Sequence, residues 1–153
     1  MENVTTDIIN MMLKQLGADS VKTTPAKITI VKFDIAHDFR LTYLFEVHRD
    51  EFAYLQRVAP YPMMLGKFYG EQDIVDYIEK DYKKFCRAYG SSNFEKFLEL
   101  ASDLTMLDRK IEDLFLTRKV PKEALEELDE EMKKIHITLQ QITERGPLLP
   151  KDN

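Results

Sequence analysis

The last part of this 153-residue chain carries apolar residues at intervals that alternate between three and four. They are Leu125, Leu128, Met132, Ile135, Leu139 and Ile142. This spacing makes a narrow apolar stripe along one side of a helix, about three heptads long. Such a stripe needs a second helix against it, either in the same chain or in a second copy. We call these six residues the seam and predict that they form an interface.

Two other helices are predicted before the seam. In the first, one apolar stripe ends at Gly90, a residue typical of helix ends; it consists of Ile74, Ile78, Tyr82, Phe85 and Tyr89. The next helix opens near Ser92 and has a wider apolar face. Pro121 suits the first turn of the final helix, which should end near Arg145, before Gly146. Because only a few residues link the last two helices, they should form an antiparallel hairpin.

The first 70 residues have a different pattern. A short helix is predicted over Thr5–Leu16 and is followed by a polar connection. β-Branched residues and alternating apolar residues then predict three strands: Lys27–Ile35, Arg40–Val47 and Glu51–Val58. Their short connections permit only antiparallel pairing, and a fourth short strand is expected at Lys67–Tyr69. One face of this sheet should be covered by helices and the other partly open.

The chain is therefore predicted to have an α+β fold. We expect an N-terminal helix, a three- to four-stranded antiparallel meander and three helices, of which the last two form the hairpin. Residues 1–147 should make a single domain, because 153 residues are enough to bury one core. Residues 148–153 are predicted to be a disordered tail.

Composition restricts the function classes. The net charge of −5 argues against general binding to nucleic acid or anionic lipid. No apolar run reaches the roughly 18 residues of a membrane span, and the N-terminus lacks the basic residues of an export signal. Cys86 is the only cysteine, so no intramolecular disulfide can form, in agreement with a reducing compartment. We expect a cytoplasmic protein without membrane association.

Metal sites are not favoured by the spacing of the soft ligands. His37 and His48 lie at opposite ends of the second predicted strand, roughly 35 Å apart at about 3.3 Å per residue. His136 has no second ligand one helical turn away, and zinc requires several. Asp34 and Asp38 do not belong to a calcium loop. We predict no metal and no cofactor.

Catalytic residues are not favoured either. The basic neighbours of Cys86 would promote a thiolate, but no partner base accompanies it, and a packing role explains it as well. The many paired carboxylates lie opposite apolar stripes, as expected of solvated helix faces, and no glycine-rich phosphate loop is present. The chain is predicted not to be an enzyme.

Two binding hypotheses remain open. The first is a small-ligand or peptide pocket at the junction of sheet and helices, lined by Arg57, Tyr61, Met63, Met64 and Tyr69. There Arg57 would hold a carboxylate or phosphate through two hydrogen bonds. Packing over the core explains the same residues.

The second is a nucleic-acid contact through a basic stripe on one helix face, formed by Lys80, Lys83, Lys84 and Arg87. Net acidity favours a solvated face in which Glu79 and Asp81 offset these charges. The leading prediction is a non-enzymatic interaction or assembly protein. It should be a homodimer, or bind another protein, through its long C-terminal helices.

Overall fold

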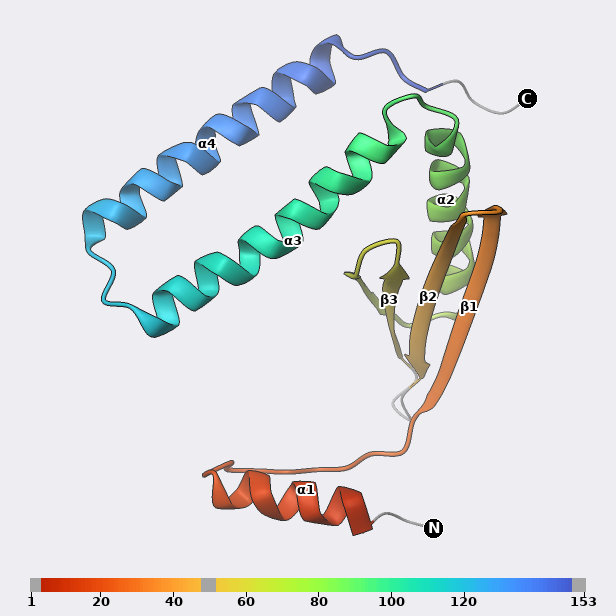
Figure 1. The fold of residues 1–153 in the computed structure, drawn as a ribbon. Coiled ribbons are helices and arrows are strands. Elements are labelled where there is room, and N and C mark those ends of the chain that lie inside the picture. Colours follow the sequence, from red (N-terminus) through yellow and green to blue (C-terminus); the bar gives the residue numbers. More distant parts are fainter. Residues whose placement is uncertain (1–3, 48–51, 150–153) are drawn as a thin grey trace.

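The computed structural model describes residues 4–47 and 52–149 (Figure 1). Its elements are α1 (Val4–Gln15), β1 (Lys27–Ala36), β2 (Phe39–Val47), β3 (Ala53–Ala59), β4 (Met63–Phe68), α2 (Glu71–Tyr89), α3 (Phe94–Thr117) and α4 (Lys122–Arg145). The predicted α+β fold, with its N-terminal helix, meander and helical hairpin, is confirmed. The single domain and the disordered tail stay predictions, since residues 150–153 lie outside the described part of the chain. His48 and Glu51 lie outside it as well.

The four strands form one antiparallel sheet in the order β1-β2-β3-β4. In its register, Tyr43 of β2 lies opposite both Val31 of β1 and Arg57 of β3. Partner residues in a sheet point to the same face, so these three side chains lie on one side. This is the side on which α2 packs.

The fourth strand begins earlier than its predicted position at Lys67–Tyr69. It spans Met63–Phe68, and its pairing with β3 shifts between Leu55 and Gln56. Gly66, with φ of 145°, takes up a conformation there that other residues adopt rarely. Pro60 and Pro62 precede the strand and do not interrupt it.

The core lies between the inner face of the sheet and α2. Its buried apolar residues are Phe39, Leu41, Tyr43, Ala53, Leu55, Ile74, Ile78, Phe85 and Phe94. On the opposite face of the sheet, Ile28 and Ile30 are exposed. The expectation of one covered face and one partly open face is confirmed.

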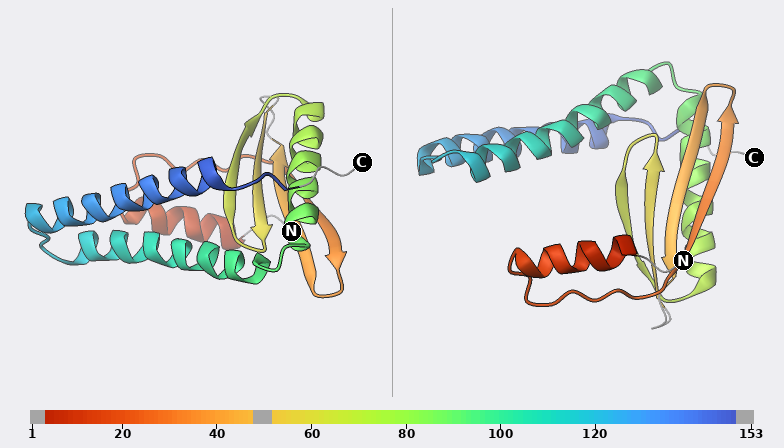
Figure 2. Two further views of the ribbon diagram at one scale, coloured as in Figure 1. Left: turned by 90° about the horizontal axis from the view of Figure 1, so that it is seen from above. Right: turned by 60° about the horizontal axis from the view of Figure 1, so that its bottom comes forward.

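Helices α1 and α4 and most of α3 lie outside this core. In Figure 2, α1 and the α3–α4 hairpin extend from the sheet on the side away from α2, with α1 separate from the hairpin. Phe94 at the start of α3 belongs to the core, whereas α4 has no buried residue. No helix in the described part of the chain has the length and apolar character needed to cross a bilayer.

Candidate functional site

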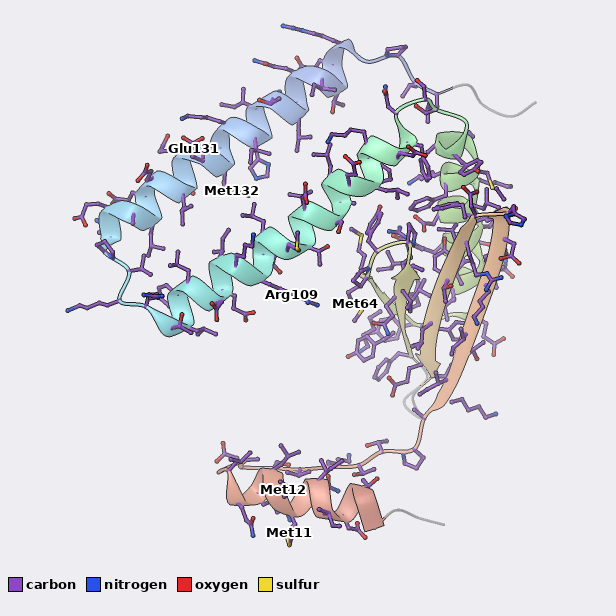
Figure 3. All side chains as sticks on the ribbon, viewed as in Figure 1. Met11, Met12, Met64, Arg109, Glu131 and Met132 are labelled. Atoms are coloured by element: carbon purple, nitrogen blue, oxygen red, sulfur yellow. The ribbon has the colours of Figure 1, made fainter. Side chains whose placement is uncertain are left out.

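The seam is only half covered by its own chain. Met132 lies on the side of α4 that faces α3, whereas Glu131 lies on the other side (Figure 3). Even so, the exposed fraction rises along the helix from 37% at Leu125 to 42% at Ile135 and 62% at Ile142. The neighbouring helix therefore covers the seam progressively less towards the C-terminal end of α4.

The partner helix has its own uncovered apolar residues. Exposed large side chains occur along α3, and they are Phe97, Leu100, Leu104, Met106, Leu107, Leu114, Phe115 and Leu116. A helix in a two-helix hairpin can bury only one stripe of this set. The wide apolar face expected for this helix is thus present and lacks a second neighbour within the described residues.

The accessible surface of the whole chain gives the same picture. It is 13,020 Å² for 18.0 kDa. A compact monomer of this mass exposes about 8,000 Å². Exposed apolar patches far above the usual size mark sites of association.

The charges of α4 are divided along its length. Residues 122–131 contain six acidic residues and one basic residue, whereas residues 132–145 contain three basic residues and one acidic residue. Local ion pairs bridge the boundary, where Lys133 meets Asp129 and Glu130. Two copies of α4 in antiparallel contact would place each acidic half beside a basic half.

Arg57, a residue of the predicted pocket, is buried and paired with a residue of α2. Its side chain is buried and holds the carboxylate of Asp81, with Nη2 2.8 Å from Oδ1 and Nε 3.0 Å from Oδ2. The hydroxyl of Tyr43 donates to the same carboxylate at 2.7 Å. The guanidinium also lies 4.8 Å from the ring centre of Phe85. Arg57 therefore holds a carboxylate bidentately, but that carboxylate belongs to the protein.

The assignment of Asp81 to a solvated face was wrong. It lies seven residues after Ile74 and three after Ile78, so it shares the buried stripe of α2 with them. The spacing is visible in the sequence, so the burial of Asp81 could have been predicted from it. Tyr82, expected in that stripe, is half-buried, and its ring centre lies 4.7 Å from that of Phe33.

The other predicted pocket residues are divided. Tyr61 is half-buried beside Arg57, and burial raises the pKa of its hydroxyl. Met63 and Met64 are exposed. Tyr69 alone of the five lines a cavity of about 940 Å³, which lies between the sheet and α2. Ligand binding beside Arg57 stays a prediction.

The basic stripe lies on the outer side of α2. Lys80 and Lys84 are exposed, Arg87 is half-buried, and Lys83 pairs with Glu79 at 2.6 Å. Cys86 on the same helix is half-buried. The structure thus places the four basic residues on one surface, and a nucleic-acid contact there stays a prediction. Among the described residues, no group of three or more histidine, cysteine, aspartate or glutamate side chains is placed to hold a metal ion.

Comparison of this chain with protein-family models, curated proteins and solved structures finds no match.

Proposed function

We propose that this protein is a non-enzymatic assembly protein that self-associates through its α3–α4 hairpin. The observation that carries the proposal is the seam, which keeps heptad spacing over six residues while more than a third of Leu125, Met132 and Ile135 stays exposed. A heptad stripe is stable when it is buried against another helix. The hairpin of a second copy would supply that other helix and complete a four-helix bundle.

The area supports a large interface. The chain exposes about 5,000 Å² more than a compact monomer of its mass. Two such chains could bury several thousand Å² together, which is the range of obligate homodimers. The divided charge of α4 supports an antiparallel contact about a two-fold axis. In such a contact, the acidic half of α4 in one copy lies beside the basic half of α4 in the other.

The solution mass tests the proposal. Light scattering at micromolar concentration should give twice the 18.0 kDa mass of one chain. Ile135→Lys should weaken the dimer by about 100-fold or more, because an unpaired ammonium group would enter an apolar contact.

A matched control lies two residues further along the same helix. Ile137 is also an exposed isoleucine, but it lies outside the seam, about 200° away around the helix. Ile137→Lys should leave the mass unchanged. An 18.0 kDa wild-type chain, or equal effects of the two substitutions, would contradict the proposal.

A further inference from the structure

The cavity between the sheet and α2 is an apolar space that no residue of the described part of the chain fills. Its volume is about 940 Å³, and its walls come from all four strands and from α2. Glu71 and Glu79 are the only charged residues among the fifteen that line it. The apolar walls include Val31, Phe33 and Phe45 from the strands. Such a surface favours an apolar occupant.

One helix is too narrow to cover this sheet. Neighbouring strands lie about 4.8 Å apart, so four strands are about 14 Å across between the outer axes. A helix is about 10 Å in diameter. The part of α2 that lines the cavity runs from Glu71 to Tyr82, which is twelve residues, or about 18 Å. The uncovered strip of sheet beside α2 is therefore about as long as another short helix of twelve residues.

The described chain contains one short helix that lacks a tertiary partner for its apolar face. This helix, α1, is also twelve residues long. Ile8, Ile9, Met12 and Leu13, together with Leu16 just after the helix, fall within about 140° of its circumference, and all are exposed; the exposed Met11 lies outside this arc. Asp7, Asn10 and Lys14 take the opposite side. The helix is thus suited to lie on an apolar surface with its polar side outward.

The path of the chain leads α1 away from its own cavity. Residues 16–26 connect it to β1 and contain no helix or strand. Pro25 favours an extended conformation in the residue before it. Figure 2 shows α1 on the side of the sheet away from α2, which lines the cavity. Eleven extended residues span up to about 36–40 Å, enough to reach a neighbouring molecule.

We propose that α1 of one copy occupies the cavity between the sheet and α2 of a second copy, in a reciprocal exchange of N-terminal helices. Exchange of an element between identical chains creates an interface from contacts that the sequence already encodes. The inference rests on the self-association proposed above, but it assigns that association a second contact, separate from the seam.

Mixed single-cysteine chains test the exchange. In a Cys86→Ser background, one chain carries Met12→Cys on the apolar side of α1. A second chain, distinguished by a tag, carries Val75→Cys on the cavity wall. After mixing and mild oxidation, the two should form a covalent heterodimer on a denaturing gel. Lys14→Cys, on the polar side of the same helix, is the matched control and should give at least about tenfold less of this product when paired with Val75→Cys.

A single chain with both Met12→Cys and Val75→Cys separates the alternatives. A disulfide within one chain would show that α1 fills its own cavity and would overturn the exchange. No disulfide in either experiment, with circular dichroism showing folded chains, would leave the cavity to another occupant and would also overturn it. Adding Ile135→Lys to both mixed chains distinguishes the two proposals. A heterodimer that survives this change supports the exchange even if the seam contact fails, whereas a dimer of full mass without the disulfide supports the seam alone.

Discussion

Arg57 and Asp81 form a buried ion pair at the centre of the fold. The side chain of Arg57 is 5% exposed and that of Asp81 is 12% exposed. Desolvation of both charges is costly, and it is offset here by two parallel hydrogen bonds and a third from Tyr43. The pair joins β3 to α2 and so fixes the position of the helix on the sheet.

Removing one charge of the Arg57–Asp81 pair should strongly lower the free energy of unfolding. Asp81→Asn leaves the guanidinium buried without a counter-charge, and we expect the free energy of unfolding to fall by about 3–5 kcal/mol in urea denaturation. Glu79→Gln, which removes the exposed partner of Lys83, should cost less than about 1 kcal/mol. Combining Arg57→Met with Asp81→Asn should destabilise less than Asp81→Asn alone. Losses that simply add would show that the two charges do not compensate each other.

Tyr43 should make stability depend on alkaline pH. Burial, and then the hydrogen bond to the Asp81 carboxylate, raise the pKa of its hydroxyl above the ordinary value of about 10. The neutral hydroxyl thus stabilises the native state fully below pH about 10, and this stability is lost as pH rises towards the native pKa. The difference in unfolding free energy between wild type and Tyr43→Phe should therefore shrink by about 1.4 kcal/mol per pH unit above pH about 10. Urea denaturation across this range checks it, and a constant difference would exclude the shift.

At the scale of the elements, the two amphipathic helices α2 and α4 differ in what covers them. The apolar stripe of α2 packs on the sheet, whose aromatic side chains meet it: the ring centre of Phe85 lies 6.1 Å from that of Phe39. No residue of the α4 seam is buried in the described structure, and its exposed fraction reaches 62% at Ile142. Both stripes were predictable because each repeats within a single helix. Their different burial was not, since it depends on which elements meet in space.

The strands show the same contrast. Residues two apart in a strand share a face, and in β2 both Leu41 and Tyr43 are fully buried. The limits of β4 were predicted less well, because its pairing depends on a register shift opposite Leu55 and on the backbone of Gly66. Such a shift leaves no periodic signal in the sequence.

At the scale of the whole molecule, the exposed surface is large because the core is small. Most buried apolar residues come from the sheet and α2, and none of the described residues of α1 or α4 is buried. Separate chains would thus leave about 5,000 Å² more surface in water than a compact monomer does. Association would supply the burial that the single chain lacks.

Thermal stability should consequently depend on concentration. If two chains of 153 residues unfold together as a dimer, a 100-fold increase in concentration adds about 2.7 kcal/mol and should raise Tm by about 4 °C. Calorimetry or circular dichroism at several concentrations measures this. Ile137→Lys should keep the dependence and Ile135→Lys should reduce it. A wild-type Tm independent of concentration would show that association does not stabilise the fold.

The sequence by itself determined the kinds and order of the elements, the antiparallel meander and the seam, because these follow from periodicity and from short connections along the chain. The sequence also places Asp81 on an apolar stripe, although the charge of this residue suggested that it is exposed to solvent. Only the tertiary structure decided that Arg57 meets Asp81, that α3 leaves the seam half exposed, and that a cavity lies beside α2. Those facts depend on which faces of distant segments come together, and packing between distant segments has no signature in local spacing.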